Sequence, residues 1–387
     1  MGWSHRERVL AAIARKQTDR PPIDFGGTRV TAIHGDAYRR LTDYLGIGAP
    51  EQAASPSKGA LTLVRQSVMA LPEESVLERF DVDTRYLGLG AYAGGRRRQV
   101  DAETQIDEWG TTWKRSGESH FIYMDGPFFN VKSPGIKELE AYDWPDPDNP
   151  GTYEGLAERA RTLRRDTDAA IILNLPSGPV SQGQFVRGFG DWLKDLHKNR
   201  EFIGRLSEIL ADHWIRIAHN ALDAVGDNVD LFLFSDDLGG QGGPLFNPDM
   251  YEKLIKPHHA RMIAAVKERT GLKSVLHSCG SVHRMIPHLI DIGVDALNPV
   301  QVSARDMEPE RLKKEFGEHL AFWGAIDSQE ILPFATPDQV RAEVRRVIEC
   351  MGAGYVLASV HNIQSEVPPE NIEAMFDEAR SYRPRAG

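Results

Sequence analysis

The sequence predicts an α/β protein built as a single (β/α)8 TIM barrel, with an N-terminal helix and a β-hairpin insertion in its first half. Eight short β-like runs recur along the 387 residues, and a helical pattern follows most of them. Strands that alternate with helices imply a parallel sheet with right-handed crossovers. Eight such repeats favour closure into a barrel over an open sheet. The runs are "PPIDFG" (21–26), "DTRYLGL" (83–89), "AIILNLPSG" (170–178), "LFLFSDDLGG" (231–240), "SVLHSCG" (274–280), "ALNPVQ" (296–301), "LAFWGAID" (320–327) and "YVLASVHNI" (355–363).

A helix is expected at the N-terminus, over residues 4–16. Ser4 is followed three residues later by Glu7, which is the spacing of a capping box. Val9 and Ile13 then lie on one apolar stripe of the predicted helix. The first β-like run follows this helix directly and ends in glycines.

The alternation of strands and helices is interrupted over about residues 90–145, after the second run. The segments "TQIDEWGTTWKRSG" and "SHFIYMDGPF" predict a β-hairpin insertion rich in aromatic residues. The clearest helices come later, at 247–271 and 336–354, each with a cap-like residue in front and glycine behind. No low-complexity linker divides the chain, so residues 1–387 are predicted to form one domain.

Charge and composition argue against several classes of protein. The net charge is −10, which disfavours binding to nucleic acid or to an anionic membrane. No segment reaches the roughly 18 apolar residues of a membrane span, and the N-terminus lacks a secretory pattern. Two cysteines make no disulfide framework, and Cys350 is expected to be a small buried residue of a helix. We therefore expect a cytoplasmic protein that acts on a small molecule.

Polar and ionisable residues stand at the ends of nearly all the predicted strands. In a TIM barrel the active site is assembled at the C-terminal ends of the strands. So many polar side chains at these ends predict an active site there. The residues at these ends are Asp24, Asn174, Ser177, Ser235, Asp236, Asp237, His277, Cys279, Asn298, Gln301, Asp327, His361 and Asn362.

His277 and Cys279, at the end of the fifth strand, are candidate metal ligands. Side chains two apart on an extended strand point the same way, and an imidazole with a thiolate suits zinc. The alternative is a core cysteine beside a hydrogen-bonded histidine. His361, at the end of the eighth strand, would complete a His/Cys/His set with an open fourth position, as in catalytic zinc sites. Asp236 or Asp237 would complete the ligand set or orient His277.

The chain resembles the uroporphyrinogen decarboxylase superfamily, which includes the decarboxylase and methyltransferases that take methyl groups from corrinoid proteins. The resemblance covers most of the chain and implies the (β/α)8 barrel. It begins with "RERVLAAIARKQTDRPPIDFGG" and is strongest in "FSDDLGGQGGPLFNPDMYEKLIKP", "HSCGSVHRMIPHLIDIGVDALNPVQ", "FWGAIDSQEILP" and "GYVLASVHNIQSEVPPENIEAM".

The resemblance is closer to the methyltransferase branch than to the true decarboxylase. That branch carries the H-x-C zinc ligands, matched here by His277 and Cys279, and usually a further cysteine where this chain has His361. The decarboxylase has an arginine-rich segment after its first strand, and here "GGTRVTAIHGDAYRRL" keeps Arg29 as one matching cation. A substrate with many carboxylates needs several fixed cations, so this departure disfavours the decarboxylase reaction.

Three functions follow as hypotheses. The first is a zinc-dependent methyltransferase that moves a methyl group from a corrinoid on a partner protein to a thiol or another small acceptor. The second is a metal-free carboxy-lyase of the decarboxylase type, in which Asp24 or Asp237 would stabilise the intermediate. The third is a barrel that binds a corrinoid or another small ligand without turnover. The resemblance also implies a homodimer.

In the methyltransferase hypothesis each polar residue at the barrel mouth has an expected role. Zn²⁺ is held by His277, Cys279 and His361. Asp236, Asp237 and Asp327 are the expected catalytic residues, which orient ligands or move protons. The residues expected to bind substrate are Asp24, Arg29, Asn174, Ser235, Asn298, Gln301 and Asn362.

Overall fold

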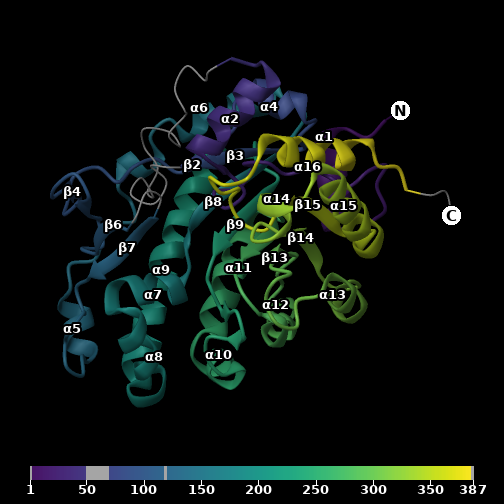
Figure 1. Ribbon diagram of the computed structural model, residues 1–387. Coiled ribbons are helices and arrows are strands. Elements are labelled where there is room, and N and C mark those ends of the chain that lie inside the picture. The colour runs from purple at the N-terminus through teal and green to yellow at the C-terminus, as the bar shows by residue number, and fades with distance from the viewer. Residues whose placement is uncertain (1, 49–68, 117–119, 385–387) are drawn as a thin grey trace.

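The centre of the molecule is a curled sheet of parallel strands (Figure 1). The structure, a computed structural model, describes residues 2–48, 69–116 and 120–384. Seven strands follow one another in the order β15-β14-β13-β12-β9-β8-β3. They are β3 (Thr84–Gly88), β8 (Ala170–Ser177), β9 (Leu231–Ser235), β12 (Lys273–His277), β13 (Ala296–Val300), β14 (Ala321–Ile326) and β15 (Tyr355–Ser359).

The segment around Ile23 closes this sheet into the predicted barrel. Ile23 forms a parallel bridge with Leu357 of β15, and its carbonyl oxygen accepts a hydrogen bond from the backbone N–H of Asp83, next to β3. The first expected strand (21–26) is thus shortened to a single bridge. Pro21 and Pro22 explain this, because proline has no N–H to contribute to a ladder.

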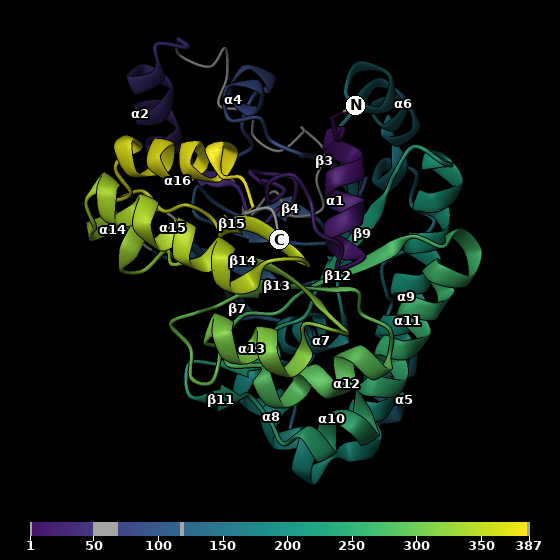
Figure 2. The ribbon, with the colours of Figure 1, turned by 90° about the vertical axis from the view of Figure 1, so that its right-hand side faces the viewer.

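Helix α1 (His5–Ile13) covers the N-terminal end of the barrel (Figure 2). The predicted capping box is present, with the Ser4 hydroxyl and the Glu7 carboxylate each accepting from the other residue's N–H. Val9, Ala12 and Ile13 pack against the inward-facing side chains of the strands in one buried cluster. The helix therefore seals one end of the barrel and leaves the other end for the site.

The remaining helices surround the sheet, and most follow a strand as expected. The predicted helix 336–354 is α15, which starts after a Thr336 cap and ends at Gly352. The predicted helix 247–271 is two helices that meet at Ile255, because the ring and missing N–H of Pro257 prevent a continuous helix. The helices are α2 (Gly35–Leu45), α4 (Glu74–Arg79), α5 (Ile136–Ala141), η1 (Pro150–Tyr153), α6 (Leu156–Asp166), α7 (Pro179–Arg187), α8 (Phe189–Lys198), α9 (Arg200–Val225), α10 (Pro248–Leu254), α11 (Lys256–Thr270), η2 (His283–Met285), α12 (Ile286–Asp291), α13 (Pro309–Phe316), α14 (Ile331–Phe334), α15 (Pro337–Met351) and α16 (Pro369–Ser381).

The expected insertion is a four-stranded antiparallel sheet between β3 and α5. Its strands are β4 (Arg98–Gln99), β5 (Thr104–Ile106), β6 (Thr112–Ser116) and β7 (His120–Asp125). Residues 117–119 of the predicted hairpin lie outside the described residues. In Figure 1 this sheet and α1 lie on opposite sides of the barrel. The insertion therefore stands at the open end, beside the carboxyl ends of the strands.

Short strand pairs complete the fold at this end. β1 (Ile33–His34) pairs with β2 (Met69–Ala70), and β10 (Gly239–Gly240) pairs with β11 (Gly243–Pro244). Among the described residues, none of the helices combines the length and apolar character that crossing a bilayer requires.

The inward-facing side chains change character along the strands. Near the α1 end they are apolar and fully buried, as in Leu231 and Val275. At the last inward position of the neighbouring strands β9 and β12 they are polar, namely Ser235 and His277, which are register partners. Because successive side chains alternate between the two faces of a strand, this change of character places polar groups at the open end.

Candidate metal and substrate site

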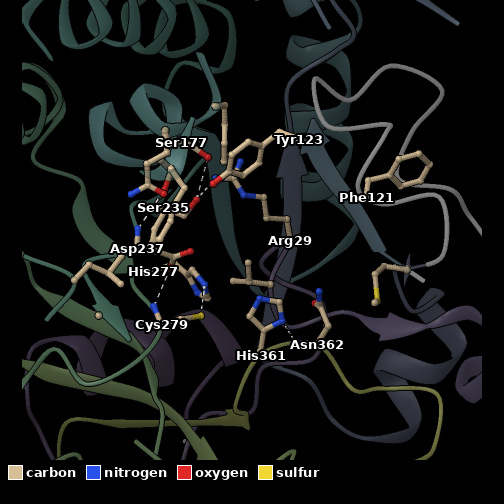
Figure 3. A pocket seen from close by; sticks show the side chains of 18 of the residues that line it. Arg29, Phe121, Tyr123, Ser177, Ser235, Asp237, His277, Cys279, His361 and Asn362 are labelled. Carbon is tan, nitrogen blue, oxygen red and sulfur yellow. Dashed lines mark hydrogen bonds between the residues drawn. The ribbon is translucent and has the colours of Figure 1, made fainter. Parts of the chain in front are cut away.

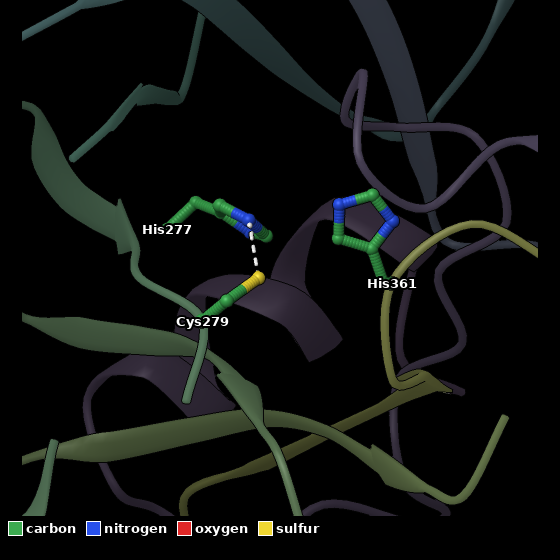
Figure 4. A group of neighbouring side chains, drawn as sticks. All are labelled: His277, Cys279 and His361. Atoms are coloured by element: carbon green, nitrogen blue, oxygen red, sulfur yellow. Dashed lines mark hydrogen bonds between the residues drawn. The ribbon is translucent and has the colours of Figure 1, made fainter. Parts of the chain in front are cut away.

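The three predicted metal ligands come together at the open end of the barrel (Figure 4). His277, Cys279 and His361 each offer a ligand atom, and these atoms all lie within 4.8 Å of one another. Sγ of Cys279 is 3.3 Å from Nε2 of His277. The centroids of the His277 and His361 rings are 5.4 Å apart. Ligand atoms around a tetrahedral zinc are roughly 3.3–3.7 Å apart. Small side-chain rotations are therefore enough to close the set on one ion.

His277 is held in the tautomer that a metal requires. Its Nδ1 lies 2.7 Å from Oδ1 of Asn298 on the neighbouring strand. The Nδ1 proton is therefore donated to Asn298, and the lone pair of Nε2 faces Cys279. Burial also lowers the pKa of His277, which keeps the ring neutral. A second partner that orients a ligating histidine in this way is typical of metal sites.

The loop that carries Cys279 is fixed by its own backbone. Four successive N–H groups donate to acceptors from two neighbouring segments, 237–240 and 298–301, and Gly280 has a positive φ of 85°. A Cβ atom at Gly280 would lie 2.4 Å from the backbone of Gly239, so glycine is required there. The four bonds run from Ser278 to the Asn298 carbonyl (2.7 Å), Cys279 to Asp237 Oδ1 (3.0 Å), Gly280 to Gln301 Oε1 (2.7 Å) and Ser281 to the Gly240 carbonyl (2.8 Å).

The Cys279 thiol is protonated unless a cation is near. Burial raises its pKa well above the usual value, and the carboxylate of Asp237 raises it further. A divalent metal reverses this balance, because a coordinated thiol loses its proton. The chemistry of this donor set therefore fits a bound metal ion.

His361 is less prepared for a metal than His277. It follows β15 with a positive φ of 66°, and this conformation directs its ring toward the other two residues (Figure 4). Its Nδ1 accepts a hydrogen bond from the N–H of Asn362 at 2.9 Å. Ligation through Nε2 requires the proton on Nδ1, so metal binding would cost this contact. His361 is therefore the ligand that must adjust.

A pocket of about 530 Å³ opens beside these three residues (Figure 3). Its walls come from the strand ends, from α7 and α8, and from the insertion. The lining residues are Arg29, Val30, Met69, Phe121, Tyr123, Ser177, Ser181, Gln184, Phe185, Phe189, Ser235, Asp237, Gly239, Leu245, His277, Cys279, His361, Asn362 and Gln364.

Arg29 reaches across one wall of this pocket (Figure 3). Its Nη1 donates to the carbonyl oxygen of Leu175 at 2.9 Å, and its Nη2 donates to Oγ of Ser235 at 2.5 Å. Burial lowers the pKa of Arg29, while Tyr86 and Asp237 act in the opposite direction. The guanidinium stays charged, because the usual pKa of arginine lies far above neutral pH.

Most of the chain matches a known protein family. The profile described as uroporphyrinogen decarboxylase (URO-D) matches residues 118–382. The chain belongs to the URO-D family. Similar proteins within it include a methylated-thiol–coenzyme M methyltransferase of Methanosarcina mazei, 22% identical over 63% of this chain and 63% of its own length. A uroporphyrinogen decarboxylase of Methylococcus capsulatus is also 22% identical, over 68% of this chain and 74% of its own.

A solved structure supports the same fold. The structure of a methyltransferase from Methanosarcina mazei aligns with 98% of this chain and 98% of its own, with a TM-score of 0.63 and 19% identity. Two kinds of reaction are therefore represented among similar URO-D proteins, and the side chains of the site must distinguish them.

In this URO-D family member, the pocket gathers seven of the predicted site residues. The seven with a predicted role are Arg29, Ser235, Asp237, His277, Cys279, His361 and Asn362, and Ser177, another of the predicted strand-end residues, also lines the pocket. Asn298 and Gln301 stand behind the pocket, where they hold His277 and the Cys279 loop. These two side chains hold the candidate metal ligands in place, and their predicted role in binding substrate stays a prediction.

Three other predicted residues form hydrogen bonds within the barrel wall and do not line the pocket. Asn174 holds the Arg29 segment, accepting from the Arg29 N–H at 3.0 Å. Asp24 is 1% exposed and accepts from the hydroxyl of Thr84 at 2.6 Å and the indole N–H of Trp323 at 2.9 Å, and burial raises its pKa. Asp327 accepts from the N–H of Gln329 at 2.7 Å, outside the pocket lining.

Asp236 lies on the opposite side of the wall from the site. It is fully buried, and its carboxylate accepts from the N–H groups of Val180 and Ser181 in the first turn of α7. It also pairs with Nε2 of the buried His259 at 2.7 Å. The geometry therefore assigns Asp236 a structural role in place of the predicted catalytic one, and Asp237 is the aspartate that faces the pocket.

An aromatic wall of the pocket was not predicted from the sequence. Phe121 and Tyr123 come from β7, and Phe185 and Phe189 come from α7 and α8. Aromatic residues two apart in β7 were the available signal, because alternate residues of a strand share one face. The sequence does not say which surface the insertion covers, so their position at the site could not be inferred.

Proposed function

We propose that this protein is a zinc-dependent methyltransferase that moves a methyl group from a corrinoid on a partner protein to a thiol or another small acceptor. The observation that carries the proposal is the convergence of His277, Cys279 and His361 on one pocket. Two of the similar proteins support it by name, the methylated-thiol–coenzyme M methyltransferase and a methylcobamide:CoM methyltransferase of Methanosarcina barkeri.

Zinc is the metal that this donor set favours. One thiolate and two imidazoles are borderline-soft ligands, which suit zinc better than magnesium or calcium. Three protein ligands leave a fourth position for the acceptor. When bound, zinc lowers the pKa of a coordinated thiol, so that the acceptor becomes a nucleophile near neutral pH.

Asp237 is the residue that we propose to receive the acceptor's proton. Its Oδ1 accepts from the backbone N–H of Cys279. The carboxylate also accepts a hydrogen bond from the Cys279 thiol, and the side chain lines the pocket. Loss of that thiol proton to a bound metal would leave the carboxylate available as an acceptor, while its Oδ1 still positions the Cys279 loop. A carboxylate within reach of the leaving proton is the usual arrangement for a general base.

The decarboxylase alternative finds less support in the pocket. Among the described residues, Arg29 is the one arginine or lysine that lines it. Asp24, one of the two aspartates considered for that reaction, is buried in the wall with its oxygens occupied. Incubation with uroporphyrinogen tests this alternative directly. We expect no coproporphyrinogen to form.

Elemental analysis of the purified protein tests the proposal. We expect about one zinc per chain, and a large loss of zinc in His277→Ala and Cys279→Ser. His361→Ala should lose less, because His277 is already in the ligating tautomer and His361 is not. Cys350→Ser and His319→Ala are matched controls, since Cys350 is on α15 and His319 is exposed outside the pocket lining.

Turnover completes the test. A methyl-corrinoid and a thiol are supplied, and the loss of the methyl-corrinoid is followed by its absorbance. Wild-type protein and both control variants should be active, whereas Cys279→Ser should not. Zinc-free wild-type protein that retains full activity would contradict the proposal.

A further inference from the structure

Arg29 is a cation in the pocket wall that forms no ion pair with the described residues, although the carboxylate of Asp237 is near enough to raise its pKa. Its guanidinium carries five N–H groups, and two of them donate to Leu175 and Ser235. Among the residues that the structure describes, the other three meet no acceptor, and no carboxylate forms an ion pair with this side chain. The unused N–H groups of a guanidinium that lines a pocket can be donated to a charged acceptor on a ligand. This corner of the pocket therefore favours an anionic ligand.

Two hydroxyl groups extend the same corner. Oγ of Ser177, at the end of β8, is 3.4 Å from Oγ of Ser235, and both side chains line the pocket. Hydroxyl groups can donate hydrogen bonds to an anion. A planar guanidinium beside such donors matches a carboxylate, which accepts two parallel N–H bonds from arginine.

The corner formed by Arg29, Ser177 and Ser235 lies one strand away from the metal ligands. Ser235 on β9 is the register partner of His277 on β12. Neighbouring strands are about 4.8 Å apart. A ligand that touches both places is therefore small, on the scale of one ring with a substituent at each end.

The aromatic wall gives such a ligand an apolar surface to pack against. Phe121, Tyr123, Phe185 and Phe189 line the pocket on the side of the insertion and α7. The ring centroids of Tyr123 and Phe185 are 5.2 Å apart. These two rings pack against each other, and the aromatic surface that they leave toward the pocket favours a planar ring. The pocket thus combines a cationic corner, an aromatic wall and a candidate metal site.

We infer that the acceptor is a small arenecarboxylate thiol, with its carboxylate on Arg29, its ring against the aromatic wall and its thiol directed to the three metal ligands. The thiol end rests on the proposed function. The carboxylate end does not need zinc, so the two can be tested separately.

Calorimetric titration of wild-type protein with benzoate, benzamide and cyclohexanecarboxylate tests the carboxylate and ring. Benzoate should bind both the zinc-loaded and the metal-free protein. Benzamide should bind about 10- to 100-fold more weakly, the range expected when hydrogen bonds to a charged group are lost. Cyclohexanecarboxylate should also bind more weakly than benzoate. Equal binding of benzoate and benzamide would overturn the inference without any variant.

Substitutions then locate the two contacts. Arg29→Gln should abolish the preference for benzoate over benzamide, and Arg29→Lys should keep part of it if the glutamine variant does not fold. Arg98→Gln is the matched control, because Arg98 is exposed on β4 outside this pocket. Phe189→Ala should weaken benzoate binding, whereas Phe334→Ala, at a side chain 76% exposed on α14, should not.

The metal end is tested with 4-mercaptobenzoate. It should bind more tightly than benzoate to zinc-loaded protein, and this advantage should vanish in Cys279→Ser. Benzoate binding that is lost when zinc is removed, but is retained in Arg29→Gln, would show that the carboxylate binds the metal. This result would refute the inference. Benzoate binding through Arg29 in a protein that never takes up zinc would support the carboxylate contact and contradict the proposed function.

Discussion

Asp236 and Asp237 are neighbours in the chain, and their side chains lie on opposite sides of the barrel wall. Asp236 accepts hydrogen bonds from the first turn of α7 and from His259, and it is fully buried among the outer helices. Asp237 lines the pocket and holds the Cys279 loop. The first aspartate therefore supports the fold, and the second supports the site.

Replacing Asp236 with alanine should destabilise the protein strongly. Two N–H groups and a buried histidine would lose their partner, which typically costs about 3–5 kcal/mol for a buried pair. Asp237→Ala should cost about 1 kcal/mol or less but should impair zinc retention and turnover. Urea unfolding of both variants checks this contrast. Similar unfolding free energies would contradict the assigned roles.

Asn298→Leu should weaken zinc binding by about 10- to 100-fold, the usual effect of losing the partner of a ligating histidine. The reason is that His277 would no longer be held with its proton on Nδ1. Asn298→Asp keeps an acceptor at this place and should retain zinc. Competition with a chromophoric chelator measures both affinities. The idea fails if the leucine variant binds zinc as tightly as wild-type protein.

Gly27→Ala should destabilise the closure of the barrel by about 1–3 kcal/mol, as overpacking does. A Cβ atom there would lie 2.3 Å from Oγ1 of Thr84 and 2.6 Å from Oδ1 of Asp24, within the buried hydrogen bond that joins these two residues. Gly204→Ala is a matched control that should change the stability in the opposite direction. It lies within α9 with nothing within 4 Å of the new atom, so alanine should stabilise the helix. Thermal unfolding of both variants compares them.

The stability that His5 contributes should depend on pH. Its ring bridges Asp81 at 2.8 Å and Asp168 at 2.5 Å, and the hydrogen bond to Asp81 is the main reason that the pKa of His5 is raised above 6.5. A raised pKa means that the contribution is fully present below 6.5 and is lost as the pH rises through the folded-state value. The stabilisation by His5 also requires that Asp81 and Asp168 are ionised, and therefore a pH above about 4.

The measurement is urea unfolding of wild-type protein and His5→Gln at about pH 5.5 and pH 8.5. The difference between them should be larger at the lower pH. The ion pairs are partly exposed, so we expect an effect of about 1 kcal/mol or less. A difference that grows with pH would show that the sign is wrong.

Much of the barrel and the metal-ligand cluster could be predicted from the sequence. Alternation of β-like and helical patterns located all eight strand positions, and the rule that barrel sites lie at strand ends linked His361 to His277 and Cys279. The pattern could not show that Asp236 turns outward, because β9 is apolar on both faces and its sequence does not reveal which alternate residues face the barrel interior. The contact between Arg29 and Ser235 could not be predicted from the pattern either, because it depends on how the first loop folds over β9.

Helix α1 closes the barrel at its N-terminal end, with Val9 and Ile13 packed into the interior. In the part of the chain that the structure describes, this packing blocks passage along the barrel axis, so the donor, acceptor and product of the proposed reaction would all use the open end. In the proposed reaction this imposes an order of events. The small acceptor must be seated before a protein-borne donor covers the open end, and the methylated product can leave only after that partner has departed.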